Sequence, residues 1–409
     1  MSPSIENAIP IKSSERYVIL DALRGFALFG IALANFPEFS LYTFLNTEAT
    51  QAMPSHAIDR TVRFLQYMFI DGKFYTVFSL LFGIGFSIII SNAMKKGADG
   101  FRIFYRRMTL LAAFGFLHLM FIWSGDILML YALLGLLLPS FCHLSDKRLF
   151  AWSATMLFLP VIVDFIQEIF HMTLSAPIVE LQRYYCAKYG ITDANFAYWL
   201  HDAKDYKSVF EFLIQGALVR VQEFIDGNRF FKVFGLFLLG FYIGKHKLYA
   251  DIAGNKQILH KTFKTGLFAG LPLAVLYTWS GTCNHPLGLT VHSILYLVSV
   301  FPLGFAYVAG ICLLYLKHPE WKIFSIFAAP GRMALTNYIM QSVIGMLLFY
   351  GIGFGLGSKI GLWQTELIVM GVFLFQIVFS HFWFALFKFG PLEWIWRMLT
   401  YGKWFNILK

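Results

Sequence analysis

Charged side chains are scarce in this 409-residue sequence. Aspartate, glutamate, lysine and arginine make up 14% of the chain, against about 25% in a typical soluble domain. Apolar residues make up 58% and aromatic residues 19%. A soluble fold of this length has no core large enough to bury so much apolar surface. The composition therefore excludes a soluble protein and indicates an integral membrane protein.

Cysteine is rare as well, and the four that occur form no Cys-x-x-Cys pair. Cysteine-based zinc and haem motifs are therefore excluded, and the histidine spacings predict no metal site. The net charge is +10, but the lysines and arginines fall between apolar runs instead of forming one basic patch. Nucleic acid is thus not an expected partner, and the basic residues indicate orientation in the membrane.

A helix that crosses the ~30 Å hydrocarbon core needs about 17–25 residues. The apolar runs predict an all-α transmembrane bundle of about ten helices in a single integral membrane domain, 1–409. Its N-terminal half (18–170) and C-terminal half (229–409) would hold five helices each. An extracytoplasmic loop (171–228) with an amphipathic helix at 206–226 would separate them. The ten runs are 18–36, 74–92, 107–124, 127–143, 149–170, 229–244, 265–280, 291–316, 333–353 and 365–387.

Lysine and arginine alternate between the loops. The segments after the second, fourth, sixth, eighth and tenth runs are rich in both, whereas the segment 281–290 has neither. Because these residues are retained on the cytoplasmic side, both termini are expected in the cytoplasm. Cys186 and Cys283 then fall in external loops, where a disulfide is permitted, although two distant free thiols are an equal alternative.

Two runs begin with similar residues. Ile70-Asp71-Gly72-Lys73-Phe74 leads into the second run, and Ile225-Asp226-Gly227-Asn228-Arg229-Phe230 leads into the sixth with one inserted residue. Both runs would cross from outside to inside, so the similarity predicts a parallel internal repeat with Asp71 and Asp226 at comparable depth. Chance likeness between aromatic-rich helix starts is the alternative.

Ionisable residues inside the first run point to a polar stripe. Such residues are costly to desolvate and normally face a bundle interior or a cavity. Asp21 and Arg24 are three residues apart and share a helical face. Asn35 returns to almost the same face about 16 Å further along. The sequence predicts Arg24 towards the cytoplasm and Asn35 near the outer end; an interfacial ion pair with a capping asparagine is the alternative.

His118 lies inside the third run, shortly before the external turn that contains Gly125 and Asp126. Along a straight helix His118 and Asp126 would be about 12 Å apart. Gly125 would let the turn fold back, so that the carboxylate orients the imidazole as a general base. A histidine that only satisfies a buried hydrogen bond is the alternative, and His56 is a weaker candidate base.

The ninth run carries two amides one turn apart, Asn337 and Gln341. Hydrogen bonding between helices is the favoured interpretation, and substrate binding is the alternative. Arg332 at the cytoplasmic end of this run is a candidate ligand for phosphate.

Several of these motifs occur in an order that resembles the DUF418, or YeiB-like, membrane proteins. The resemblance spans nearly the whole chain and implies the cytoplasmic (inner) membrane of a bacterium. It rests on Leu20 to Gly30 through Asn35, Asp71 to Phe74 through Gly83, His118 through Trp123 to Leu128, Gly331 to Tyr338, and Gly390 to Trp394.

That family is in turn distantly similar to transmembrane acyltransferases, among them acyltransferase-3 proteins and heparan glucosaminide N-acetyltransferases. These enzymes take an acyl group from cytoplasmic acyl-CoA and deliver it to a glycan across the membrane. Acyltransferase-3 proteins carry an arginine followed eleven residues later by a histidine. Here Arg24 holds the arginine position but Asn35 replaces the histidine, so the identity of the base is open.

The resemblance implies acyl-CoA as donor, an extracytoplasmic acceptor and membrane lipids as partners; a homo-oligomer is left open. The alternative is a transporter or flippase for a small or lipid-linked substrate that uses the intramembrane carboxylates, and a scaffold ranks last. The expected catalytic residues are His118, Asp126, Asn35 and Asp71. Phosphate binding is expected from Arg24, Arg106, Arg107 and Arg332, and substrate binding from Lys73, Asn337, Gln341 and Asp226.

Overall fold

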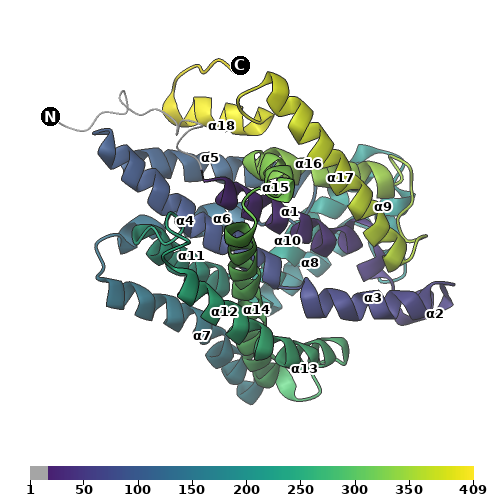
Figure 1. Cartoon of the computed structure of the whole chain (residues 1–409). Helices are drawn as coiled ribbons and strands as arrows, with labels where there is room; N and C mark the ends of the chain where they lie inside the picture. Colours follow the sequence, from purple (N-terminus) through teal and green to yellow (C-terminus); the bar gives the residue numbers. More distant parts are fainter. Residues whose placement is uncertain (1–16) are drawn as a thin grey trace.

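The computed structural model describes residues 17–409, and its regular elements are helices (Figure 1), which confirms the all-α class. They are α1 (Val18–Phe39), α2 (Thr47–Ala52), α3 (His56–Phe69), α4 (Lys73–Lys95), α5 (Gly100–Phe121), α6 (Leu128–Gly135), α7 (Asp146–Phe170), α8 (Ala176–Tyr189), α9 (Trp199–Asp202), α10 (Tyr206–Asp226), α11 (Arg229–Lys245), α12 (Lys256–Phe268), α13 (Gly270–Thr282), α14 (Gly288–Lys317), α15 (Lys322–Arg332), α16 (Ala334–Phe349), α17 (Leu362–Leu386) and α18 (Pro391–Tyr401).

Several of these helices suit a membrane. Among residues 17–409, five helical segments are long and apolar enough to cross one: Val18–Phe39, His56–Lys95, Asp146–Phe170, Gly288–Lys317 and Leu362–Leu386. Each of the ten predicted runs coincides at least in part with a helix, although the seventh run is divided between α12 and α13. The membrane class is thereby confirmed, and the number of crossings stays a prediction.

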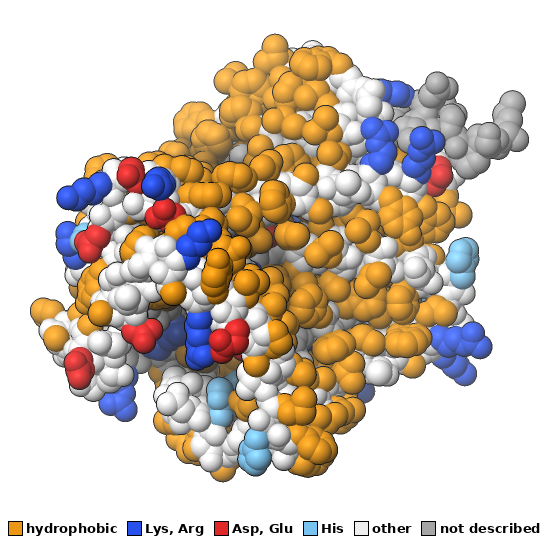
Figure 2. Space-filling model, turned by 180° about the vertical axis from the view of Figure 1, so that it is seen from behind, with side chains coloured by type: hydrophobic (Ala, Val, Ile, Leu, Met, Phe, Trp, Pro, Cys, Tyr) orange, Lys and Arg blue, Asp and Glu red, His pale blue; other side chains and the backbone are white. Residues whose placement is uncertain are grey.

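The surface agrees with this class. Figure 2 shows hydrophobic side chains spread over the middle of the molecule, with Lys, Arg, Asp and Glu gathered towards its two sides. A belt of exposed apolar side chains between charged ends is what a bilayer requires of the protein that it surrounds.

Helices α4 and α11 lie side by side and run parallel, and small residues let their backbones touch. A Cβ atom added to Gly83 would lie 2.1 Å from the carbonyl oxygen of Phe237, and one on Gly240 would lie 3.0 Å from the Cα of Gly83. One turn further along both helices, a Cβ on Gly244 would lie 2.5 Å from the Cβ of Ser87. This is the small-xxx-small packing of transmembrane helices.

The similar starts of these two helices have similar backbones but different surroundings. Gly72 before α4 and Asn228 before α11 both adopt a left-handed conformation, with φ of 75° and 50°. Asp71 is half-buried and accepts a hydrogen bond from the Tyr277 hydroxyl at 2.5 Å, whereas Asp226 is exposed. The parallel packing agrees with the predicted repeat, but the two aspartates do not occupy equivalent positions.

The loop between the halves contains the expected helix. α10 covers Tyr206–Asp226 and packs against α8, α5 and α11 with its apolar face. Its start is capped by Asp205, whose carboxylate accepts the Ser208 N–H at 2.8 Å. Cys186 and Cys283 are both free thiols, so the disulfide is not formed.

Candidate functional site

A cavity of about 910 Å³ lies inside the bundle. One face of α1 lines it from end to end, through Asp21, Arg24, Ile31, Asn35 and Glu38. Arg24 donates from Nη1 to Asp21 Oδ1 at 2.7 Å. The predicted polar stripe is therefore confirmed: Arg24 and Asn35 face the same cavity.

The glycines of two predicted motifs place α1 against α15 at one end of this cavity. A Cβ atom on Gly25 would lie 1.9 Å from the carbonyl oxygen of Phe327, and one on Gly331 would lie 1.9 Å from that of Asp21. Because only glycine permits this approach, the neighbouring Arg24 and Arg332 reach the same end of the cavity.

That end of the cavity is strongly basic, and its basic residues lie in cytoplasmic segments of the predicted topology or at the cytoplasmic ends of its membrane runs. The Arg107 guanidinium stacks 4.1 Å from the ring centre of Trp396 on α18. Arg106 does not line the cavity, because it turns away and donates to the carbonyl of Leu399 at 2.9 Å. The lining basic residues are Arg24, Lys95, Lys96, Arg107, Lys247, Arg332 and Arg397, accompanied by the acidic Asp21 and Glu393.

Glu393 belongs to this end although its role was not predicted. Its carboxylate accepts the N–H groups of Leu335 and Thr336 at 2.8 and 3.1 Å, and the Thr336 hydroxyl at 2.6 Å. It therefore caps the start of α16, where a negative charge is favourable. Burial raises the pKa of the Glu393 carboxyl, and the hydrogen bonds from Thr336 oppose that rise.

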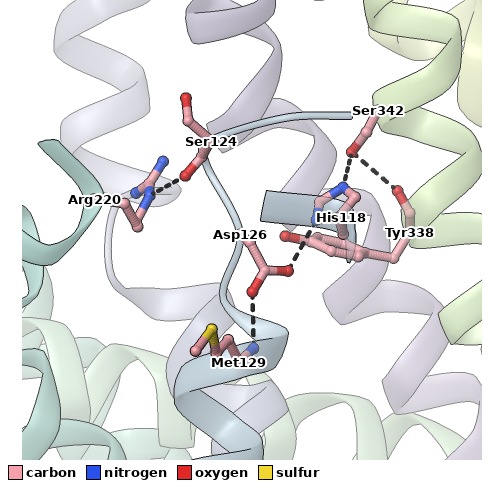
Figure 3. A network of polar contacts seen from close by, with 7 residues as sticks. All are labelled: His118, Ser124, Asp126, Met129, Arg220, Tyr338 and Ser342. Atoms are coloured by element: carbon pink, nitrogen blue, oxygen red, sulfur yellow. Dashed lines mark hydrogen bonds and ion pairs between the residues drawn. The ribbon is translucent and has the colours of Figure 1, made fainter. Parts of the chain in front are cut away.

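The opposite end of the cavity mixes acidic and basic groups around one buried arginine. Arg220 on α10 is only 6% exposed. Its Nη2 donates to both carboxylate oxygens of Glu38 at 3.2 Å, and its Nη1 donates to Glu223. Its Nε donates to the Ser124 carbonyl at 3.0 Å (Figure 3). Glu38 and Glu223 thus lie on the cavity wall at this end, together with Asp71 and Arg229.

Asp71 was among the expected site residues, and of the others at this end the sequence contained a signal only for Glu38. Glu38 follows Asn35 by three residues and continues the polar stripe, so helical spacing alone could have identified it. Arg220 lies on an amphipathic helix with other polar residues, and its inward direction depends on how α10 packs.

His118 and Asp126 meet as predicted, and Ser342 on α16 completes a row of three (Figure 3). His118 Nδ1 lies 2.8 Å from Asp126 Oδ1, and His118 Nε2 lies 2.8 Å from Ser342 Oγ. The other carboxylate oxygen of Asp126 accepts the Met129 N–H at 2.8 Å. Gly115 allows the hairpin to close, because a Cβ there would lie 2.5 Å from the Met129 nitrogen.

The order Asp126, His118 and Ser342 matches that of a serine-hydrolase triad, but the three side chains lie behind the cavity wall. Each residue is about 1% exposed, and none of the three lines the cavity. Tyr338, whose ring centre is 5.2 Å from that of His118, does line it. The row therefore reaches the cavity only through its neighbours: Tyr338, and Ser124 in the turn, which accepts a hydrogen bond from Arg220 on α10.

Four other predicted residues lie away from the cavity, like His56. Lys73 is buried and donates to the Tyr67 carbonyl at 2.7 Å, and Asp226 is exposed at the end of α10. Asn337 donates to Ser380 at 3.1 Å, and Gln341 donates to Gln376 at 2.9 Å.

Both partners of these amides are on α17, so the favoured interpretation of Asn337 and Gln341 as helix–helix contacts is confirmed. In the part of the chain that the structure describes, no group of His, Cys, Asp and Glu is arranged to hold a metal ion.

Comparison with known proteins gives relatives along the whole chain. Residues 243–403 match a family model described as "Protein of unknown function (DUF418)". The chain is 32% identical to "Uncharacterized protein YxaH" of Bacillus subtilis (strain 168), with 98% of each chain covered. It is 28% identical to "Uncharacterized protein YeiB" of Escherichia coli (strain K12), with 94% of this chain and 96% of the relative covered. No solved structure matches it.

Proposed function

Because the chain belongs to the DUF418 family and its bundle encloses a cavity with two differently charged ends, we propose that it is a transmembrane acyltransferase. One observation carries the proposal: a single face of α1 lines the cavity from Arg24 to Glu38. These residues are fourteen positions apart, which corresponds to about 21 Å of helix. A donor bound at one end and an acceptor bound at the other would meet inside the bundle.

The basic end suits an acyl-CoA donor. Its phosphates are anionic, and guanidinium groups such as Arg24, Arg107 and Arg332 bind phosphate through charge-assisted hydrogen bonds. Lysine and arginine are retained on the cytoplasmic side, where acyl-CoA is made. We therefore place this end at the cytoplasmic face of a bacterial inner membrane.

The middle of the cavity suits the acyl group of acyl-CoA and the flexible chain that links the thioester to the phosphates. Its wall is mainly apolar and includes Phe78, Leu81, Phe82, Leu111 and Leu128. Such a wall lowers the local dielectric and so strengthens polar interactions with the thioester.

The reaction at the other end is an acyl transfer. A base takes the proton from an acceptor hydroxyl or amine, and the acceptor atom attacks the thioester carbonyl. The carbon–sulfur bond then breaks, the base returns the proton to the CoA sulfur, and CoA leaves as the thiol. The Asn35 amide would donate to the oxyanion that forms on the carbonyl oxygen.

Blocking the cavity tests the proposal. Gly85 lines the cavity, and a Cβ atom there would have no neighbour within 4 Å. Gly85→Trp is expected to abolish binding of acetyl-CoA to the purified protein, measured by calorimetry. The matched control is Gly371→Trp on the exposed face of α17, which also has no neighbour within 4 Å and is expected to bind like wild type. A wild-type protein that neither binds nor hydrolyses acetyl-CoA would overturn the proposal.

Transport is the second candidate, because a cavity with charged groups at both ends also suits a carrier. Asp71 is the relevant carboxylate, since it lines the cavity and is held by Tyr277. A transporter would take up substrate into vesicles without CoA, and Asp71→Asn would abolish that uptake. An acyltransferase would instead require CoA thioester for any change in its acceptor.

A further inference from the structure

We infer that Glu38 is the general base that activates the acceptor, and that the buried row formed by Asp126, His118 and Ser342 helps to position it. The inference rests on the proposed acyl transfer and names a residue for its proton-transfer step. The acceptor would be a hydroxyl compound without net negative charge, or water.

Glu38 is the carboxylate best placed for this step. It is three residues beyond Asn35 on the same face of α1, so base and oxyanion donor share one helix. Its side chain is largely buried, which restricts its movement. It is still 24% exposed, and it lines the cavity. Asp71 lines the cavity too, but it precedes α4 and does not share a helix with Asn35.

The alternative base, His118, is about 1% exposed and does not line the cavity. Asp126 is likewise about 1% exposed and does not line the cavity. A base must come within hydrogen-bonding distance of the proton that it accepts, and neither residue can do so from behind the wall.

A chain of contacts links this buried row to Glu38. The His118–Asp126 pair holds the turn between α5 and α6, and Ser124 in that turn accepts the Arg220 Nε–H at 3.0 Å. Arg220 Nη2 in turn donates hydrogen bonds to both carboxylate oxygens of Glu38. Arg220 is thus a positioning residue.

The charge around Glu38 determines the kind of acceptor. This end of the cavity carries the carboxylates of Glu38, Asp71 and Glu223 and the guanidinium groups of Arg220 and Arg229. With three acidic groups against two basic ones, an anionic acceptor would be repelled, whereas a neutral hydroxyl group finds both hydrogen-bond donors and acceptors.

The proton transfer needs no reagent besides the thioester donor and the acceptor. Glu38 takes the proton of the acceptor O–H as the oxygen attacks the thioester carbonyl. The carbon–sulfur bond then breaks, and the carboxylic acid returns the proton to the leaving thiolate. The carboxylate is thereby regenerated.

The test compares two nucleophiles with acetyl-CoA as the donor. Water needs a base, whereas hydroxylamine is nucleophilic at neutral pH without one. In Glu38→Gln we expect the rate of acetyl-CoA hydrolysis to fall about 10²-fold or more, the range for loss of a general base. Transfer to hydroxylamine and the affinity for acetyl-CoA should stay near wild type. The control, Glu180→Gln on the exposed surface of α8, should leave all three unchanged.

Two results would overturn the inference while leaving the proposed function intact. One is hydrolysis by Glu38→Gln at the wild-type rate. The other is an equal loss of hydrolysis and hydroxylamine transfer, which would indicate a structural role for Glu38. If wild type itself neither binds nor hydrolyses acetyl-CoA, both the inference and the proposed function fail.

Discussion

Gly83→Leu is expected to prevent the bundle from folding. The added side chain would begin 2.1 Å from the backbone oxygen of Phe237, and backbone atoms cannot move aside as a flexible side chain can. Helices α4 and α11 would have to separate. Ordinary overpacking costs about 1–3 kcal/mol, and a clash with backbone should exceed that range. The yield of monodisperse protein after solubilisation in detergent, read by size-exclusion chromatography, measures the effect.

Gly85→Leu is the matched control for this prediction. It lies two residues further along α4 and makes the same chemical change, but a Cβ there meets no atom within 4 Å. This variant should fold with nearly wild-type yield. Equal yields from Gly83→Leu and Gly85→Leu would contradict the packing described for α4 and α11.

His118→Ala is expected to destabilise the protein by about 1–3 kcal/mol, the usual cost of leaving a buried hydrogen-bonding group without its partner. The Asp126 carboxylate is 1% exposed and would lose its partner at 2.8 Å. Thermal unfolding of the purified protein in detergent should show this as a lowered midpoint temperature. Ser342→Ala removes a neutral hydrogen bond to the same ring, so it should cost only about 1 kcal/mol.

A double-mutant cycle separates the pair from general damage. Asp126→Ala alone should also be destabilising, because Asp126 caps α6 through Met129. His118→Ala combined with Asp126→Ala should cost less than the two single changes together, with a coupling of about 0.5–3 kcal/mol. Strictly additive losses would mean that the two residues do not depend on each other.

Helical periodicity predicted the parts of the site that lie on one helix. The spacing of Arg24 and Asn35 identified the stripe on α1 because residues eleven apart share a face in any helix, whatever surrounds it. The short connection between the third and fourth runs likewise predicted the fold-back of the hairpin, although the glycine at its close contact is Gly115 and not the expected Gly125. Such features depend on geometry within one helix or one turn, and residue spacing along the sequence predicts that geometry.

Helical spacing could not predict the contacts between helices that are distant in the sequence. Asp71 and Asp226 have similar flanking residues, yet one lines the cavity and the other is exposed. Arg220 and Glu393 appeared as ordinary charged residues of amphipathic helices, although both reach the cavity. The neighbouring helices determine which face of a helix turns inward, and the local sequence pattern does not indicate that face.

The sequence by itself determined that this is a helical membrane protein with a polar face along its first helix. Scarce charge, long apolar runs and helical spacing suffice for that, because each acts through the bilayer or within one helix. Only the tertiary structure decided that this face lines a cavity, that His118 lies behind its wall and that Glu38 lies on it. The physical reason is that burial and exposure inside a bundle arise from packing between helices far apart in the chain.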